Sequence, residues 1–170
     1  MREVFLRKII SGGQTGADQA GLWTAKSFGL ATGGWAPEGF KTSEGPAPDL
    51  MARYGVKELP GSGYRKRTFR NVNDSDATIR LAADFGTPGE KCTLNAIKEC
   101  GKPHFDVDLN TTYGRPKPNP KECAEWIIMG KFRTVNIAGN TQWTNGIDIF
   151  TKVRVYLGEV FRLMGFDPAV

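Results

Sequence analysis

The chain has 170 residues, of which 39% are hydrophobic and 24% charged, a composition typical of a globular protein with one ligand-binding domain, residues 1–170. No apolar run approaches the roughly 20 residues of a membrane span, and Arg7 and Lys8 interrupt the apolar N-terminal segment, so we expect a cytoplasmic protein with no membrane partner. The net charge of +5 indicates an anionic partner, either a nucleic acid or a phosphorylated small molecule. Three cysteines without a CxxC pair, and His104 as the single histidine, favour neither a disulfide framework nor a zinc site.

Short β-branched runs alternate with longer amphipathic segments along the whole chain. This alternation predicts βαβ units and therefore an α/β fold with a mostly parallel sheet. Ligand sites in such sheets lie outside the carboxyl ends of the strands.

The first unit contains the stretch SGGQTGADQAG, residues 11–21. We expect a strand over residues 4–10 and a helix from Gly16 onward, whose small residues let it lie close to the sheet. Gly12 and Gly13 at the corner allow unusual backbone angles and close approach of a ligand, and free N–H groups there can face an anion.

Thr15 and Asp18 have the spacing of a capping box, with Asp in place of Glu. The Asp18 carboxylate would repel an anion unless it faces away or accepts a hydrogen bond from a hydroxyl or amino group of the ligand. A ligand with an anionic part and a donor-rich part fits this corner best.

Trp35, at the end of the short predicted strand ATGGW, and Trp143, in a loop before the last helix, are candidates to cover a planar ligand. Core packing explains either tryptophan equally well. Residues 36–49 contain three prolines and two glycines and predict a long surface loop. A second Pro-rich loop is expected after the strand that begins near His104.

The basic segment YRKRTFRNVNDSDAT, residues 64–78, predicts a helix on which Arg67 and Asn71 are one turn apart. Its basic residues form either a solvated face or, through Arg67, an anion contact. Asp74 and Asp76 precede the next strand at its amino edge, where turn chemistry explains them more simply than catalysis or metal binding.

A second glycine corner follows the strand ATIRLA. Gly86 and Gly89 flank Thr87, and a helix is predicted over residues 90–99 with Gly101 as its C-cap. Thr87 and Thr93 offer hydroxyl groups to a ligand, whereas Glu90 adds negative charge. Two such corners in one parallel sheet can face each other across a crevice.

A third turn contains Gly139 and Asn140 and precedes the last helix, whose broad apolar stripe indicates core packing with some subunit contact.

Taken together, these motifs resemble those of the molybdenum carrier family, part of a Rossmann-like grouping with the lysine-decarboxylase-like phosphoribohydrolases and the DNA-processing protein A fold. The resemblance extends from about Ile9 to the last helix. It rests on five segments, SGGQTGAD, GGWAPEG, YRKRTFRNVNDSDAT, PGEKCT with GKP, and VNIAGN.

The resemblance implies an α/β Rossmann-like three-layer sandwich, a homo-oligomer (dimer or tetramer), that carries molybdenum cofactor (molybdopterin), an anionic pterin with a phosphate and a dithiolene, without catalysis. Glu90 departs from the small or hydroxyl residue expected there. By position, the resemblance implies that the first binding loop is Gly12, Gly13, Gln14, Thr15 and Gly16, with Arg67 and Asn71 at the side and Gly89 and Thr93 in the second loop.

Three alternatives stay open. The same pocket permits a nucleotide-derived signal or, less readily, hydrolysis of a nucleoside monophosphate, because GTPGEKCT lacks the PGGxGTxxE order of the phosphoribohydrolases. Nucleic-acid binding is disfavoured because no recognition helix and no aromatic and basic ladder is found. The sequence favours a binding protein and leaves catalysis open.

Overall fold

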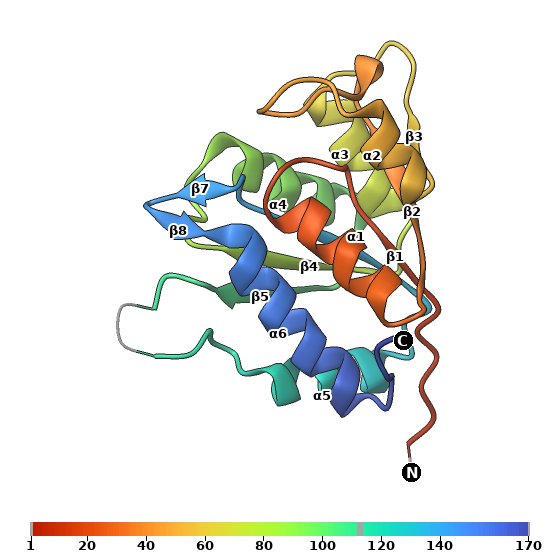
Figure 1. Cartoon of the computed structure of the whole chain (residues 1–170), viewed down its shortest axis with the longest axis vertical. Helices are drawn as coiled ribbons and strands as arrows, with labels where there is room; N and C mark the ends of the chain where they lie inside the picture. The colour runs from red at the N-terminus through yellow and green to blue at the C-terminus, as the bar shows by residue number, and fades with distance from the viewer. Residues whose placement is uncertain (1, 112–113, 170) are drawn as a thin grey trace.

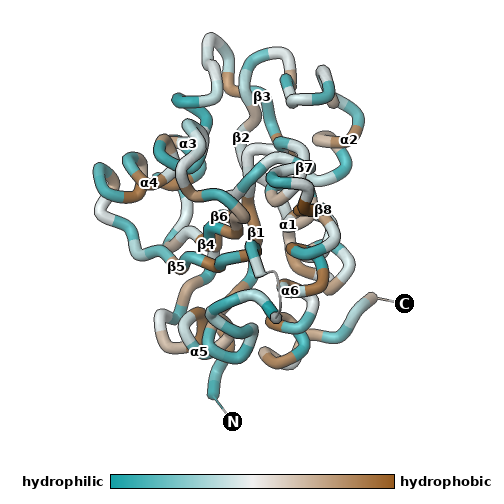
Figure 2. The backbone as a smooth tube through the Cα atoms, turned by 90° about the vertical axis from the view of Figure 1, so that its left-hand side faces the viewer, coloured by the Kyte–Doolittle hydropathy of each residue, from teal (hydrophilic) through white to brown (hydrophobic). Residues whose placement is uncertain are grey.

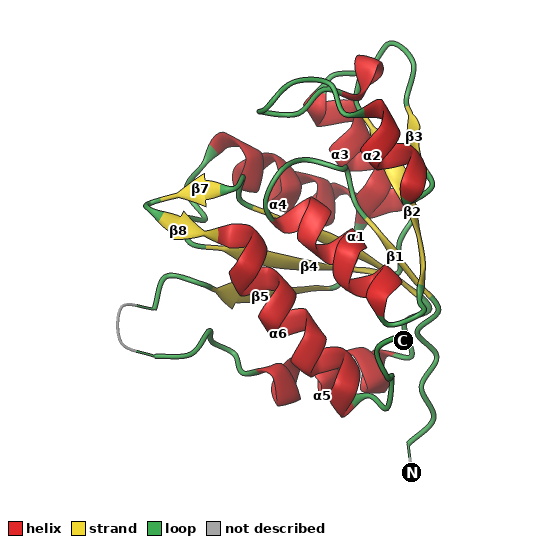
Figure 3. Cartoon of the chain, viewed as in Figure 1, coloured by secondary structure: helices red, strands yellow, loops and turns green. Residues whose placement is uncertain are grey.

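A computed structural model of the chain describes residues 2–111 and 114–169, in which strands and helices alternate (Figures 1 and 3). Six parallel strands form one sheet in the order β3-β2-β1-β6-β4-β5. Their bounds are β1 Lys8–Ile10, β2 Ala31–Ala36, β3 Val56–Glu58, β4 Ala77–Ala82, β5 His104–Asp108 and β6 Thr134–Gly139. The predicted parallel α/β sheet is therefore confirmed.

Helices cover both faces of this sheet, which makes an α/β Rossmann-like sandwich. One face carries α1 (Ala17–Ser27) and α6 (Ile149–Leu163), with α5 (Pro120–Gly130) packed on α6, and the other carries α3 (Tyr64–Asn73) packed on α4 (Pro88–Cys100). Figure 2 shows α3 and α4 on one side of the strands and α1 and α6 on the other. Within residues 2–111 and 114–169, we find no helix with the length and apolarity to cross a membrane.

The strand β4 is buried along its whole length, as expected for a strand between two neighbours and two helix layers. Its one charged residue, Arg80, is buried with it. Side chains of the adjacent strand and helix accept hydrogen bonds from the Arg80 guanidinium, namely Asp106 on β5 and Glu90 on α4. The buried Arg80 thus has one carboxyl partner on the neighbouring strand and one on the helix that covers the sheet.

The helix α1 lies close to β6 because its buried face is built from small residues. A Cβ at Gly21 would lie 2.7 Å from the Ile137 side chain, which is closer than such atoms pack. The predicted small-residue face of this helix is confirmed by the burial of Ala17, Ala20 and Ala25.

Several predicted boundaries shift. The first strand begins at Lys8 rather than near Val4, because only its last three residues pair with β2 and β6. The predicted surface loop of residues 36–49 contains a short 3-10 turn, η1 (Glu38–Phe40), and leads into α2 (Pro48–Arg53). The hairpin of β7 (Trp143–Thr144) and β8 (Ile147–Asp148) occupies the third turn. Thr112 and Tyr113, within the second expected Pro-rich loop, lie outside the described residues.

Substitution of Gly21 tests the close packing of α1. We expect Gly21→Ala to lower the free energy of unfolding by about 1–3 kcal/mol, because the added methyl group overpacks against Ile137. Gly158→Ala in α6 is the matched control, since a Cβ there meets its nearest atoms at 3.7 Å or more. We expect the control to raise stability by about 0.5–1 kcal/mol through helix propensity. Urea unfolding measures both, and equal effects would show that α1 does not depend on a small residue.

Candidate functional site

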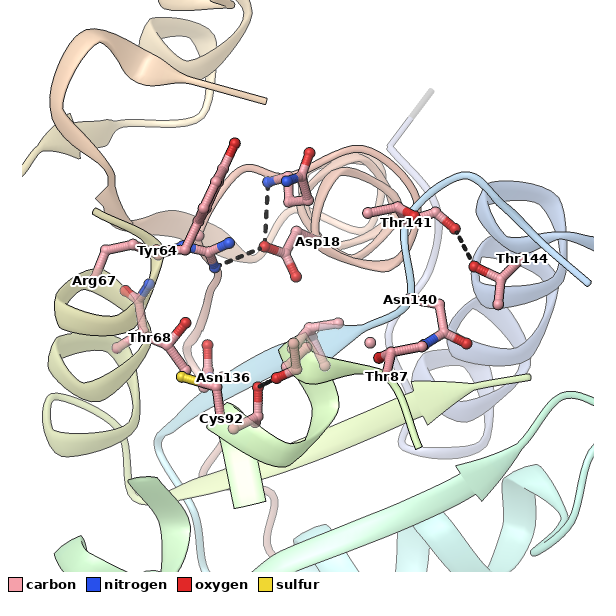
Figure 4. A pocket seen from close by; sticks show the side chains of 18 residues that line it. Asp18, Tyr64, Arg67, Thr68, Thr87, Cys92, Asn136, Asn140, Thr141 and Thr144 are labelled. Atoms are coloured by element: carbon pink, nitrogen blue, oxygen red, sulfur yellow. Dashed lines mark hydrogen bonds and ion pairs between the residues drawn. The ribbon is translucent and has the colours of Figure 1, made fainter. Parts of the chain in front are cut away.

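A cleft of about 220 Å³ opens where the carboxyl ends of β1, β6 and β4 meet (Figure 4). The loop after β1 leads to α1 on one face of the sheet and the loop after β4 leads to α4 on the other, so the two loops diverge above β6. Crevices at such switch points hold ligands in doubly wound folds. The lining residues are Gly12, Gln14, Asp18, Tyr64, Arg67, Thr68, Asn71, Thr87, Gly89, Cys92, Thr93, Asn136, Ile137, Ala138, Gly139, Asn140, Thr141 and Thr144.

The helix α3 forms one wall of the cleft with a polar stripe. Tyr64, Arg67, Thr68 and Asn71 line it, which is the i, i+3, i+4, i+7 spacing of one helix face. Arg70 points elsewhere and bonds Asp74 at 2.8 Å. The predicted basic face is therefore divided, since Arg67 enters the cleft while Arg70 lies outside it.

Arg67 reaches across the cleft to the first corner and pairs with Asp18, with 3.2 Å between Nη1 and Oδ2. The guanidinium lies directly on the backbone of Gly12, where a Cβ would fall 1.8 Å from Nη1. Gly12 is therefore required for the close approach of the arginine, and its own φ is not in the left-handed region.

Asp18 is 4% exposed, and its carboxylate also accepts a hydrogen bond from the Gln14 N–H at 3.1 Å. Burial raises the pKa of Asp18, and the charge of Arg67 opposes that rise. The first corner therefore contains a carboxyl group of its own, held in place by an arginine and a backbone N–H.

The backbone of the first corner is largely bonded within the protein. The N–H of Gly13 bonds Ser11 Oγ and that of Thr15 bonds Gln14 Oε1. The N–H of Ala17 bonds the Asn140 carbonyl. These three N–H groups are therefore not free to face an anion, because side chains and the neighbouring loop already accept from them.

Three predicted residues of this loop lie outside the cleft. Gly13 has a φ of 73° and packs on Met51, and the Thr15 hydroxyl bonds Ser43 Oγ at 2.6 Å. Gly16, with a φ of 83°, is the N-cap of α1, so the predicted capping box of Thr15 and Asp18 does not form. A Cβ at Gly16 would lie 2.4 Å from the Asn140 carbonyl oxygen, so this glycine serves loop packing.

The second corner is more open. Thr87 is the N-cap of α4 and its hydroxyl accepts from the Glu90 N–H, while Thr93 Oγ1 donates to the Gly89 carbonyl at 3.0 Å. The Gly89 N–H has no acceptor among the described residues, and a Cβ at Gly89 would meet open space. The N-terminus of this 13-residue helix therefore presents an unbonded donor and its positive dipole end to the cleft.

Glu90 lies next to this corner but outside the cleft. Its side chain is buried, 1% exposed as a residue, and Oε2 lies 3.4 Å from Arg80 Nη1. Burial raises the pKa of Glu90 to about 7, while the nearby Arg80 opposes the rise. The Glu90 carboxyl group, predicted to belong to the site, turns toward β4 and pairs with Arg80 instead of lining the cleft.

Two asparagines of the cleft hold its walls together. Asn140 Oδ1 accepts from the N–H groups of Ala83 and Asp84, which ties the end of β6 to the end of β4. Asn71 bonds both the N–H and the carbonyl of Trp35, which ties α3 to β2. Both predicted residues line the cleft, with their amides engaged by backbone.

Three other predicted site residues also lie elsewhere. Trp35 Nε1 donates to Asp74 on the outer surface. Asp76 accepts from the N–H groups of Arg133 and Thr134 at the amino end of β4, opposite the cleft. The Gly86 N–H bonds Asp84 Oδ1 in a tight exposed turn. The carboxyl and indole groups of these residues stabilise turns and strand ends.

The structure brings together ten predicted residues, namely Gly12, Gln14, Asp18, Arg67, Asn71, Thr87, Gly89, Thr93, Gly139 and Asn140. The prediction missed eight others, namely Tyr64, Thr68, Cys92, Asn136, Ile137, Ala138, Thr141 and Thr144. Helical spacing from Arg67 indicates Tyr64 and Thr68, whereas strand alternation does not single out Asn136, because its neighbours Ile137 and Ala138 also line the cleft. Thr141 and Thr144 carry no such periodic signal.

The cysteines are all free thiols, and Cys92 lines the cleft. Burial raises the pKa of the Cys92 thiol. Within the described part of the chain, no group of three His, Cys, Asp or Glu side chains is gathered in the manner of a metal site.

The fold and the cleft define a Rossmann-like protein with a polar crevice between two glycine corners. The chain belongs to the circularly permutated YpsA SLOG family, whose model matches residues 9–161. It is similar to a crystal structure at 1.45 Å resolution of a protein from Syntrophus aciditrophicus SB that is provisionally described as a molybdenum carrier protein. The two share 32% identity with a TM-score of 0.79, over 93% of this chain and 96% of that chain. No curated protein matches significantly. The resemblance found in the motifs is confirmed.

Substitution of Gly12 tests the ion pair beneath the cleft. Gly12→Ala places a methyl group where Arg67 Nη1 lies, so we expect the arginine to leave and Asp18 to stay buried without its partner. Breaking a buried pair in this way costs about 3–5 kcal/mol of the free energy of unfolding. Gly89→Ala is the control, because a Cβ there meets no atom within 4 Å. Urea unfolding measures both, and an unchanged Gly12→Ala protein would show that the contact is dispensable.

The buried Glu90 predicts a pH dependence. The folded protein holds the Glu90 proton up to about pH 7, whereas the unfolded chain loses it near the ordinary pKa of 4.5. Between these values the folded state binds more protons, so the free energy of unfolding decreases as pH rises. We expect Glu90→Gln to flatten this slope and the exposed Glu99→Gln on the same helix to keep it. Urea unfolding from pH 5 to 7 measures the slopes, and equal slopes in all three proteins would exclude Glu90.

Proposed function

We propose that this protein binds an anionic pterin or nucleotide-like molecule in the cleft and carries it without chemical change, with molybdenum cofactor as the ligand that best agrees with its relatives. The observation that carries the proposal is the open α4 corner, where the Gly89 N–H and the helix dipole face a cleft that Arg67 also lines. The solved relative supplies the ligand class through its provisional description as a molybdenum carrier.

The anionic group of the ligand would bind at the second corner rather than the first. Asp18 occupies the first corner with negative charge and would repel a phosphate there. At the second corner, the Glu90 carboxyl group is turned away from the cleft and bonds Arg80. Arg67 uses Nη1 to pair with Asp18, and its Nη2 donates to none of the described residues, so the guanidinium retains donor capacity for an anion.

The size of the cleft indicates which part of the ligand it encloses. Its volume of about 220 Å³ is below the ~300–1,000 Å³ usual for small-molecule sites. A fused pterin ring and the adjoining phosphate would occupy it, and the remainder of the ligand would lie across the rim near Tyr64, which is half exposed. The dithiolene of molybdenum cofactor binds the metal with its own sulfurs, so the protein would hold the pterin and phosphate.

The geometry favours carriage over hydrolysis. A phosphoribohydrolase needs an accessible catalytic glutamate near the second corner, and Glu90 there is buried against Arg80. Asp18 remains the carboxylate of the cleft, with one oxygen engaged by Arg67 and Gln14. A nucleotide-derived signal is the second candidate, because the cleft lies at the strand ends where Rossmann-like folds hold nucleotides.

A homo-oligomer is part of the proposal. Val155 and Leu163 on α6 are 61% and 51% exposed, and Trp23 on α1 is also exposed beside this helix. Exposed apolar side chains on these two helices support a subunit contact.

Native mass spectrometry of gently purified protein tests the proposal. We expect a bound mass that corresponds, after denaturation, to a pterin with or without molybdenum, and an oligomer larger than the monomer. Gly89→Glu places a carboxylate at the open corner, so we expect bound ligand to fall at least about tenfold.

Met129→Glu is the control for that variant, because it adds the same charge at an exposed position of α5 distant from the cleft. A nucleotide-like mass would favour the signal-binding candidate. Release of free base from added nucleoside monophosphates would contradict carriage without turnover, and a protein that binds neither pterins nor nucleotides would contradict the proposal as a whole.

A further inference from the structure

Most polar side chains of the cleft already bond the protein itself. Asn71 and Asn140 bond backbone groups, Thr93 donates to Gly89, and Gln14 Oε1 accepts from two N–H groups. Two side-chain acceptor oxygens of the cleft, Asp18 Oδ1 and Asn136 Oδ1, accept no hydrogen bond from another side chain among the described residues, and the Gly12 N–H lies near the Asp18 carboxylate. A ligand that enters the cleft meets these acceptors.

The orientation of Asp18 is determined by its other oxygen. Oδ2 accepts from Gln14 and Arg67, and Figure 4 shows the second carboxylate oxygen directed into the cleft. The residue is more than nine-tenths buried, so this oxygen is cut off from bulk water except through the cleft. Water in the cleft therefore solvates this oxygen, and a ligand that displaces the water must offer a donor such as an N–H in its place.

Asn136 lies on β6 in register with Ile10 of β1 and Thr78 of β4. Its Nδ2 donates to the Thr78 hydroxyl at 3.3 Å, which leaves Oδ1 as the free end of the amide. The residue is 3% exposed and lines the cleft. The floor of the cleft and its α1 side thus both present acceptors.

We propose that Asp18 and Asn136 recognise the donor edge of a 2-amino-4-oxo-pyrimidine ring, the ring system that pterin and guanine share. This edge places a ring N–H beside an exocyclic amino group, and both donate hydrogen bonds. Adenine places its amino group beside a ring nitrogen that only accepts, which an acceptor oxygen would repel. The inference rests on the proposed function and names the heterocycle that it selects.

The two ends of such a ligand would then bind at opposite sides of the cleft. The donor edge of the ring approaches the acceptors of α1 and β6, and the anionic group approaches the open N-terminus of α4. Pterin phosphates and guanine nucleotides carry both features on one molecule. A carboxylate such as Asp18 can therefore line the same cleft that binds an anion, because it contacts the ring and not the anionic group.

Titration calorimetry with guanosine, inosine and adenosine monophosphates and a phosphorylated pterin tests the inference. Inosine monophosphate lacks only the exocyclic amino group of guanosine monophosphate. We expect it to bind about tenfold more weakly or worse, as for loss of a hydrogen bond to a charged group, and adenosine monophosphate to bind no better. The tighter of the guanine and pterin ligands identifies the natural source of the ring.

Variants test the residues themselves. In Asp18→Asn, we expect the ratio of the affinities for guanosine monophosphate and inosine monophosphate to fall toward one. In Asn136→Ala, we expect the same ratio to fall by a smaller amount. Asp74→Asn makes the same chemical change on the outer surface, and we expect it to keep the ratio. The comparison of ligands on the unchanged protein does not depend on how well these variants fold.

Equal binding of the guanine, hypoxanthine and adenine nucleotides would overturn this inference and leave the proposed function intact. An unchanged ratio in Asp18→Asn would also overturn it. Failure of all four ligands to bind would contradict the proposed function, and the inference with it.

Discussion

The buried ion pair between Asp18 and Arg67 is the interaction on which the cleft depends. It joins the first turn of α1 to the middle of α3, two helices on opposite faces of the sheet. The arginine passes over the backbone of Gly12, so the contact exists only because that residue has no side chain. Both charges are largely buried, and each would be costly to bury alone. The pair thus holds two layers of the fold together beside the opening of the cleft.

This pair also makes the two glycine corners unequal. The first corner supplies its own carboxylate to its own backbone N–H groups, and the end of β6 accepts a further hydrogen bond from Ala17. The second corner turns its carboxylate, Glu90, toward Arg80 and leaves the Gly89 N–H unbonded. The similar strand, glycine and helix patterns therefore differ in what they offer to a ligand. The first corner offers hydrogen-bond acceptors to a ligand, and the second corner offers a donor to a negatively charged group.

The parts of the fold that depend on local sequence were predictable. Alternation of apolar runs with amphipathic segments indicated the parallel α/β sheet, and Gly101 correctly marked the end of α4 in the left-handed conformation. Of the site, the residues at strand-to-helix corners were found because strand ends in a parallel sheet meet at one edge. For Arg67, the sequence left two possibilities open, a solvated basic face or a contact in the site. Its ion pair with Asp18 places it at the cleft.

The residues that were misplaced show where sequence reasoning ends. Thr15, Glu90 and Trp35 have the chemistry of a binding site, yet their side chains bond Ser43, Arg80 and Asp74 from distant parts of the chain. No spacing rule identifies these partners, because each bond depends on how strands and helices far apart in sequence are brought together. Asn136 was missed for the same reason, since an asparagine inside a strand becomes a cleft residue only when the sheet order places it between β1 and β4.

The sequence by itself determined the class of fold, the glycine corners and the family, because these depend on periodicity and on motifs in a fixed order. Only the tertiary structure decided which side chains face the cleft and which charges are already neutralised. Hydrogen bonds and ion pairs act over about 3 Å, so their partners are set by packing in space and not by separation along the chain. For that reason Asp18 keeps one oxygen for the cleft while Glu90, at the corresponding corner, keeps none.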